Sequence, residues 1–242
     1  MKAYSLLVGF GASFAVLRVV HQVPRWQAPK WANACLFTLL GGLLGARLFY
    51  VAFHWSYFAT HLVEAAAFWL GGLHWLGMLT GAYLSILVLS ARWGVAAGVI
   101  ADRLSPMVPP LTISLLLGSW MLGIGYGGEL PENLFFAVRS ADEYGQIAPR
   151  FPAQFAAALF MLVFSIWFET RKWLVVGGGS KAALMGLGMA IAILAFTLLR
   201  VDPVPLLMGR RIDRYFAWAL TAFHALLIVR QFYHAKREVV RG

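Results

Sequence analysis

The fold is decided by the stretch Gly118-Ser119-Trp120-Met121-Leu122-Gly123-Ile124-Gly125-Tyr126-Gly127-Gly128-Glu129-Leu130, which ends an apolar run long enough to cross a bilayer. Its five glycines precede a single carboxylate, Glu129. Glycine weakens a helix, so we expect the backbone here to turn, pack closely or admit a ligand. Two interpretations stay open. Either Glu129 is a functional group, or the glycines pack against neighbouring helices and Glu129 is a solvated loop charge.

The composition is that of an integral membrane protein. Of the 242 residues, 61% are hydrophobic and only 12% are charged, whereas soluble domains are about half apolar and about one quarter charged. The formal net charge is +10, a balance that can indicate nucleic-acid binding. Here the cations stand between apolar segments, where membrane topology and anionic lipid headgroups explain them better. We therefore expect a membrane partner and no nucleic acid.

Seven apolar segments approach the length of about 20 residues that a transmembrane helix needs. They cover residues 4–20, 32–53, 70–90, 108–126, 152–168, 183–199 and 215–232. They predict an all-α polytopic membrane protein with one transmembrane domain over residues 1–242, a polar loop at 131–149 and a basic loop at 200–214. Residues 95–104 are expected to form a short interfacial helix that ends at the following prolines.

Lysine and arginine set the expected orientation, because cytoplasmic connections are enriched in them. They gather in residues 18–30, 92–103 and 171–181 and in the tail after residue 230. With seven spans, these regions share one side. The N-terminus is therefore predicted to lie outside and the C-terminus in the cytoplasm, which makes 131–149 and 200–214 outer-side loops.

The basic loop at 200–214 breaks this charge rule. It holds four arginines and two aspartates on the predicted outer side. The arginines could pair locally with the aspartates, or they could capture a lipid phosphate, which the planar guanidinium binds bidentately. We favour phosphate capture, because Arg47 and Arg150 are expected at the same depth.

Five motifs resemble the prolipoprotein diacylglyceryl transferase family, in its order and at similar spacing over most of the chain. They are Tyr4-Ser5-Leu6-Leu7, Gly45-Ala46-Arg47-Leu48-Phe49-Tyr50-Val51, Gly71-Gly72-Leu73-His74-Trp75-Leu76-Gly77-Met78-Leu79-Thr80-Gly81, the opening glycine stretch, and Pro149-Arg150-Phe151-Pro152-Ala153-Gln154-Phe155. The positions that match the family pattern are Tyr4, Arg47, Glu129, Arg150, Gln154 and Arg200. Apolar or small residues stand where the family has polar ones, at Leu76, Met121, Ile124, Gly127 and Ala157.

The resemblance implies seven transmembrane helices with the N-terminus outside, in the plasma membrane of a bacterium. It also implies transfer of a diacylglyceryl group from phosphatidylglycerol to the lipobox cysteine of a prolipoprotein. The implied partners are an anionic phospholipid and the signal peptide of the preprolipoprotein.

Such a transfer makes two chemical demands on the residues. The phosphate leaving group needs positive charge, for which Arg47, Arg150, Arg200 and Arg214 are candidates. The thiol needs a base, for which Glu129 and His74 are candidates. Tyr4 and Gln154 are candidate substrate-binding residues. We find no metal-ligand spacing, P-loop, nucleophile elbow or dinucleotide fingerprint, so no metal or cofactor is implied.

The alternative is a catalytically degenerate membrane protein that binds lipid or a partner on the same scaffold, which the unmatched polar positions favour. A small transporter fits less well, because its spans would carry ionisable residues near the middle of the membrane.

Overall fold

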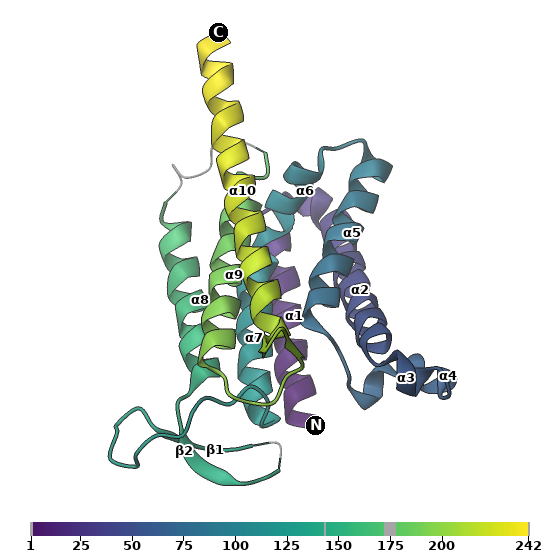
Figure 1. Cartoon of the computed structure of the whole chain (residues 1–242). Helices are drawn as coiled ribbons and strands as arrows, with labels where there is room; N and C mark the ends of the chain where they lie inside the picture. Colours follow the sequence, from purple (N-terminus) through teal and green to yellow (C-terminus); the bar gives the residue numbers. More distant parts are fainter. Residues whose placement is uncertain (1, 143, 172–177, 242) are drawn as a thin grey trace. The chain divides into compact units, whose positions relative to one another are not determined.

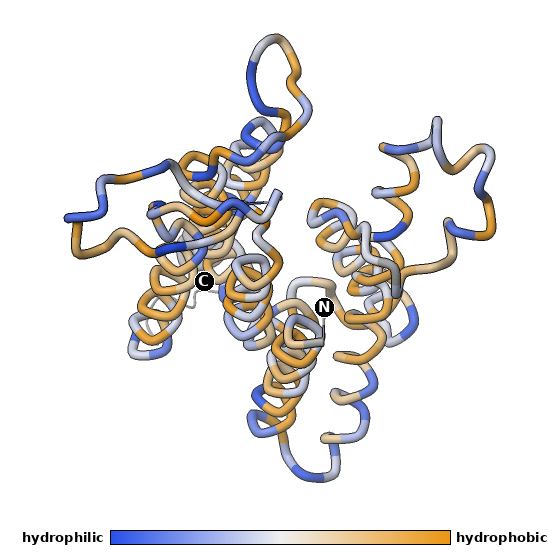
Figure 2. Tube along the Cα trace, turned by 90° about the horizontal axis from the view of Figure 1, so that it is seen from below, coloured by the Kyte–Doolittle hydropathy of each residue, from blue (hydrophilic) through white to orange (hydrophobic). Residues whose placement is uncertain are grey.

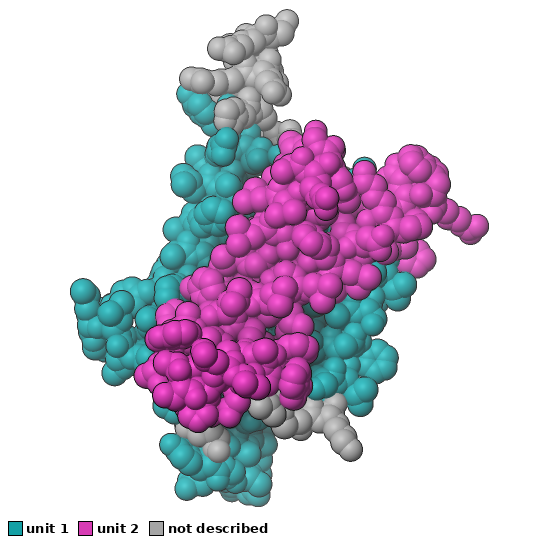
Figure 3. Space-filling model, turned by 90° about the vertical axis from the view of Figure 1, so that its right-hand side faces the viewer, with its two compact units in different colours: residues 1–18, 102–242 teal, residues 19–101 magenta. Residues whose placement is uncertain are grey.

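The computed structural model describes residues 2–142, 144–171 and 178–241. They are mainly helical, with two short antiparallel hairpins (Figure 1). They form two compact units. Unit 1 is the chain up to Arg18 together with the chain from Asp102 onward, and unit 2 is Val19–Ala101 (Figure 3).

Six helical segments of the described chain are long and apolar enough to cross a membrane. They are Ala3–Val20, Arg25–Phe53, Trp75–Trp93, Ala97–Met121, Ser180–Leu199 and Ile212–Tyr233. The remaining predicted span is the apolar helix Ala153–Glu169, whose 17 residues stand at the short end of the range for a membrane helix. Apolar residues cover the helices, and hydrophilic residues gather in the connections (Figure 2). The prediction of an all-α polytopic membrane protein is confirmed.

Unit 1 is built on five helices. They are α1 (Lys2–Val20), whose last two residues belong to unit 2, α7 (Val108–Met121), α8 (Ala153–Glu169), α9 (Ser180–Leu199) and α10 (Ile212–Arg241). Helix α8 packs against α7 and α9, and α9 packs against α10. Small residues allow the close contacts: Gly188 lies against the Phe164 ring, and Gly186 against the His224 ring. These contacts are typical of helices that associate in lipid.

The predicted interfacial helix at 95–104 needs a correction. Helix α6 (Ala97–Leu104) continues through a 3-10 turn, η3 (Ser105–Met107), into α7, so Ala97–Met121 is a single candidate span. The prolines stand in the first turns of η3 and α7, where a missing N–H costs no hydrogen bond. They therefore do not end the helical run.

Asp102 fixes the start of α9. Its carboxylate accepts hydrogen bonds from the backbone N–H groups of Gly179 (2.6 Å) and Ala182 (2.8 Å). These are amides at the N-terminus of α9, which lack partners inside the helix. The predicted connection at 171–181 falls largely on residues 172–177, which lie outside the described residues.

Unit 2 is built on two long antiparallel helices, α2 (Ala28–Phe53) and α5 (Trp75–Trp93), joined by a loop with the short helices α3 (Trp55–Phe58), α4 (Leu62–Ala65) and η2 (Phe68–Leu70). A short turn, η1 (Arg25–Gln27), precedes α2. Glycines bring the two backbones together. A Cβ added at Gly45 would lie 2.2 Å from the Gly77 carbonyl oxygen, and one added at Gly81 would lie 2.0 Å from that of Gly41. Each helix therefore presents two glycines four residues apart to the other.

Two hairpins lie in the loops that the sequence placed on the outer side. Strands β1 (Val138–Ala141) and β2 (Ile147–Arg150) form the hairpin of the 131–149 loop, of which residue 143 lies outside the described residues. Strands β3 (Leu206–Leu207) and β4 (Arg210–Arg211) form the hairpin of the 200–214 loop. Its two-residue turn has positive φ at Met208 (51°) and Gly209 (73°), which is typical of a type I′ turn. The orientation of the termini stays a prediction.

The glycine contact between α2 and α5 generates a stability prediction. Gly45→Val is expected to lower the free energy of unfolding by about 1–3 kcal/mol, because the new side chain would push against the α5 backbone. The measurement is thermal unfolding in detergent, followed by tryptophan fluorescence. The matched control is Gly9→Val in α1, where an added Cβ meets nothing within 4 Å. Equal losses in both variants would contradict the role given to the contact.

Candidate functional site

The candidate site is built on residues 126–130, which run in extended conformation after α7. The chain turns at Gly123 and Gly125, whose φ angles of 65° and 74° lie in the left-handed region that side chains other than glycine rarely adopt. The extended residues then pair on both sides. Glu129 lies opposite Arg150, and Gly127 lies opposite Arg200. The glycine stretch thus joins the ends of α7 and α9 and the beginning of α8.

Glu129 and Arg150 form an ion pair. Arg150 Nη2 lies 3.1 Å from Glu129 Oε1, and the two side chains differ sharply in exposure, at 6% for Arg150 and 68% for Glu129. The pairing explains the geometry, because residues opposite one another in an antiparallel ladder point to the same face. The arginine is therefore fixed in the protein, and the carboxylate faces outward.

Asp142 holds the same guanidinium from the β1–β2 hairpin. Its Oδ2 lies 3.3 Å from Arg150 Nη2, and its Oδ1 accepts hydrogen bonds from the Tyr144 and Gln146 amides, both at 2.9 Å. The guanidinium also lies 4.5 Å from the centre of the Tyr126 ring, close enough for a cation–π interaction. One carboxylate therefore closes the hairpin turn and fixes the arginine.

Arg150 is not saturated by these contacts. Its Nε is buried and has no hydrogen-bond partner within the described part of the chain. An unmade hydrogen bond at a buried polar atom costs about 1–3 kcal/mol. A further anionic acceptor would therefore be stabilised at this guanidinium.

Arg200, at the end of α9, is paired with carboxylates. Its Nε donates to Asp202 Oδ1 (2.5 Å), its Nη2 pairs with Asp202 Oδ2, and its Nη1 lies 3.5 Å from Asp213 Oδ2. Arg211 contacts the same two carboxylates, at 3.4 Å for Asp202 and 3.2 Å for Asp213. Two cations thus face two buried anions. Local Arg–Asp pairing, which we held open and did not favour, occurs at these two arginines.

Arg210 and Arg214 are the other cations of the 200–214 loop. Arg210 is exposed on β4, and Arg214 is half-buried. Arg214 Nε donates to the Thr197 carbonyl oxygen at 3.4 Å. No carboxylate among the described residues forms an ion pair with Arg210 or Arg214. The charge of Arg214 is therefore less neutralised by carboxylates than that of Arg200, and is more available to an anionic ligand.

Tyr4 and Gln154 brace the glycine stretch from two other helices. The Tyr4 ring lies against Gly118, where an added Cβ would come within 2.7 Å of it. Gln154 is only 2% exposed, and its Nε2 donates to the Ile124 carbonyl oxygen at 3.0 Å. Both residues therefore support the conformation of the stretch that carries Glu129.

Arg47 lies in unit 2, where it organises the loop between α2 and α5. Its guanidinium donates to four backbone carbonyl oxygens, those of Glu64, Ala65, Gly71 and Gly72, over 2.5–3.1 Å. A guanidinium has five N–H groups, so most of its capacity serves this loop. We predicted a phosphate ligand, and the structure places Arg47 as the anchor of a loop.

His74 also lies in unit 2, as the N-cap of α5. Its Nδ1 accepts a hydrogen bond from the Leu76 amide at 3.2 Å. Burial, and then the nearby charge of His54, lowers the pKa of the imidazole. A neutral ring that accepts at Nδ1 carries its proton on Nε2. His74 would therefore have to give up its cap before acting as a base, which favours Glu129 for that role.

The roles of Asp142 and Tyr126 as partners of Arg150 were not predicted from the sequence. The Arg–Asp pairing of the 200–214 loop was considered and not favoured. One signal was available: Arg200-Val201-Asp202 and Arg211-Ile212-Asp213 repeat a cation and an anion two residues apart. Among the residues described, no group of three His, Cys, Asp or Glu side chains is suited to a metal ion.

These features define a class of protein: a multi-pass membrane protein with an arginine–carboxylate site at the end of a membrane span. A model of the family described as prolipoprotein diacylglyceryl transferase matches residues 1–230. The chain belongs to the prolipoprotein diacylglyceryl transferase family.

Bacterial relatives agree with this assignment. A protein of Bordetella avium (strain 197N) is 33% identical over 209 residues, which cover 80% of this chain and 76% of the relative. A protein of Methylibium petroleiphilum is 30% identical over 192 residues, covering 76% and 72%. One of Methylobacillus flagellatus is 29% identical over 194 residues, covering 74% and 70%. All three are named phosphatidylglycerol–prolipoprotein diacylglyceryl transferase.

The double role of Asp142 generates a second prediction. Asp142→Asn keeps an oxygen for the turn and loses the charge that faces Arg150, whereas Asp142→Ala loses both. Asp142→Ala is expected to destabilise the β1–β2 hairpin by about 1–3 kcal/mol, and Asp142→Asn by less. Hydrogen exchange of the hairpin amides measures this.

Glu132→Ala in the same loop is the control. Its ion pair with Arg139 is exposed, at 68% and 72%, and such pairs contribute little stability. If both Asp142 variants exchange as slowly as Glu132→Ala, the Asp142 side chain does not hold the turn.

Proposed function

We propose that this protein transfers a diacylglyceryl group from phosphatidylglycerol to the cysteine thiol of a prolipoprotein. Its family and the names of its relatives support the reaction. The observation that carries the proposal is the Glu129–Arg150 pair, in which an exposed carboxylate meets a buried arginine whose Nε no described residue satisfies. The distribution of lysine and arginine supports an outer-face location for this pair.

In the first step, the phosphate of the lipid takes the place that the Glu129 carboxylate occupies. The exposed Glu129 side chain can move aside at little cost, whereas Arg150 is held by Asp142 and Tyr126. A phosphate offers enough oxygens to accept from both Nη2 and Nε, which a carboxylate held at Nη2 alone does not. Substrate binding would thus complete the hydrogen bonds of Arg150.

In the second step, the displaced Glu129 accepts the proton of the cysteine thiol. The thiolate attacks the terminal glyceryl carbon of the diacylglyceryl group, and a carbon–sulfur bond forms as the carbon–oxygen bond to phosphate breaks. The electron pair of that bond leaves with glycerol phosphate, whose negative charge Arg150 stabilises. The proton on Glu129 then passes to the leaving phosphate or to water. No cofactor is required.

The remaining candidates take supporting roles in this proposal. Arg214 is a better second phosphate contact than Arg200, because Asp202 and Asp213 already neutralise Arg200. Tyr4 and Gln154 hold the stretch that carries Glu129. Arg47 and His74 support the loop of unit 2 and the start of α5. The signal peptide of a prolipoprotein is the proposed acceptor partner.

One observation favours a second candidate function. Met121 and Ile124 are exposed, at 47% and 49%, where the family motif calls for polar side chains. Exposed apolar side chains on the stretch that carries Glu129 suit a protein that holds an anionic lipid without turning it over. The two functions differ in whether a thioether forms.

The test is transfer from radiolabelled phosphatidylglycerol to a lipobox peptide. Glu129→Gln is expected to lower the rate by about 10²–10⁴-fold, as for the loss of a general base. The deficit should shrink above pH 8.5, because the substrate thiol, with a pKa of about 8.5, then ionises unaided. Arg150→Gln should stay inactive at every pH.

Arg139→Gln is the control, since Arg139 is an exposed arginine in the same loop. Full activity in Glu129→Gln and Arg150→Gln would overturn the proposed roles. Lipid binding by the wild-type protein with no thioether product would establish the second function.

A further inference from the structure

Unit 1 contains a groove of about 310 Å³ that the proposed transfer reaction does not use. It is lined by helices α1, α7 and α8, chiefly through Leu7, Phe10, Phe14, Ile113, Leu117 and Leu162. Two serines also line it, but each hydroxyl already donates to a carbonyl of its own helix, Ser114 to Leu111 at 3.0 Å and Ser165 to Leu162 at 2.8 Å. Away from Arg18, the groove therefore offers no free polar group to an occupant, which suits a hydrocarbon chain.

The length of the groove matches one leaflet. Leu7 and Arg18, which mark its ends on α1, are eleven residues apart, or roughly 16 Å at the helical rise of about 1.5 Å per residue. The hydrocarbon core of a bilayer is about 30 Å thick, so the groove spans about half of it. This is the depth that one acyl chain occupies.

Basic side chains gather at one end of the groove. Arg18 lines it and forms an ion pair with the half-exposed Glu169. Lys181 interacts electrostatically with Asp102, Arg18 and Arg103, so these four charged groups lie close to one another. The carboxylate of Asp102 is occupied by the amides that begin α9. Three cations thus face two carboxylates, and the surplus positive charge suits an anionic headgroup.

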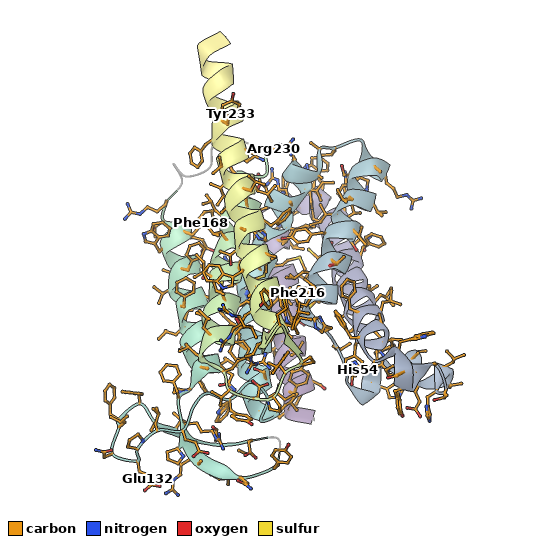
Figure 4. The ribbon with its side chains drawn as sticks, viewed as in Figure 1. His54, Glu132, Phe168, Phe216, Arg230 and Tyr233 are labelled. Carbon is orange, nitrogen blue, oxygen red and sulfur yellow. The ribbon has the colours of Figure 1, made fainter. Side chains whose placement is uncertain are left out.

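This end is remote from the candidate site. Phe168, next to Glu169, and Glu132, in the loop that follows Glu129, lie at opposite ends of unit 1 (Figure 4). The charged end of the groove therefore serves the membrane surface opposite to that of the Glu129–Arg150 pair. A lipid bound here cannot present its headgroup to Arg150.

We propose that this groove binds one acyl chain of an anionic phospholipid from that opposite leaflet, with the lipid phosphate held by Arg18 beside Lys181. An uncharged lipid would fill the groove without using the charge surplus. The occupant is therefore a phospholipid of net negative charge, bound at a second site that does not depend on the proposed transfer.

The experiment is native mass spectrometry of the detergent-solubilised protein titrated with phosphatidylglycerol or with zwitterionic phosphatidylcholine. Arg18→Gln is expected to reduce the occupancy of one phosphatidylglycerol about tenfold, the loss of a charge-assisted contact, and to leave phosphatidylcholine binding unchanged. Leu162→Trp should remove the same lipid by filling the groove.

Matched controls are Arg25→Gln, at an exposed arginine, and Val163→Trp, next to Leu162 on α8 but outside the groove lining. Both should keep wild-type occupancy. If Arg18→Gln and Leu162→Trp bind as the controls do, the proposal is wrong. It is also wrong if phosphatidylcholine binding falls equally in Arg18→Gln.

Two further readouts on the same samples separate the possible failures. Thermal unfolding shows that each variant is folded. Diacylglyceryl transfer should persist in Arg18→Gln. If transfer is absent from every sample and the lipid difference remains, the proposed function fails and the second lipid site stands.

Discussion

The pairing of residues 126–130 with the chain on either side is the constraint on which the functional end of unit 1 depends. The Val201 amide donates to the Tyr126 carbonyl oxygen, and the Phe151 amide donates to that of Gly128, both at 2.9 Å. These bonds fix where α8 begins and where α9 ends relative to α7. Gly127 allows the close approach, because an added Cβ would lie 2.3 Å from the Phe151 carbonyl oxygen. A glycine is thus needed here for the packing of the backbone, whether or not a ligand binds.

The charges at this end follow a second constraint: a buried arginine needs partners. Arg200 and Arg211 obtain them from Asp202 and Asp213, and Arg47 obtains them from backbone carbonyls. Arg150 is the exception: Asp142 and the mostly exposed Glu129 pair with it, and its buried Nε has no hydrogen-bond partner among the described residues. These arginines differ in how many of their guanidinium N–H groups have partners. Because Arg150 is the least satisfied, it is the centre of the proposed chemistry.

Most of the fold was predictable from the sequence, because hydrophobic runs report membrane spans directly. The main error, at residues 95–104, arose because prolines were read as helix ends, although they are tolerated in a first turn. The site was predictable only in part. Motif order pointed to Glu129, Arg150 and Arg200. Arg47 binds backbone carbonyls of a loop 17–25 residues further along the chain, and His74 caps α5 through its imidazole. Both roles depend on how a loop returns to a helix end, which local sequence does not encode.

The glycines of residues 118–128 have two different roles. Gly118 packs against a neighbouring helix, as one interpretation held, whereas Gly123 and Gly125 turn the chain toward a carboxylate that meets a buried arginine. A single motif therefore contains both packing and turning glycines.

The glycine contact between α2 and α5 also has a consequence for how lipids move. Where the two backbones approach closely enough for a Cβ to collide with a carbonyl oxygen, no hydrocarbon chain fits between them. The contact between α2 and α5 is therefore closed to the sideways diffusion of a lipid chain. A lipid that diffuses past unit 2 therefore has to go around the α2–α5 helix pair.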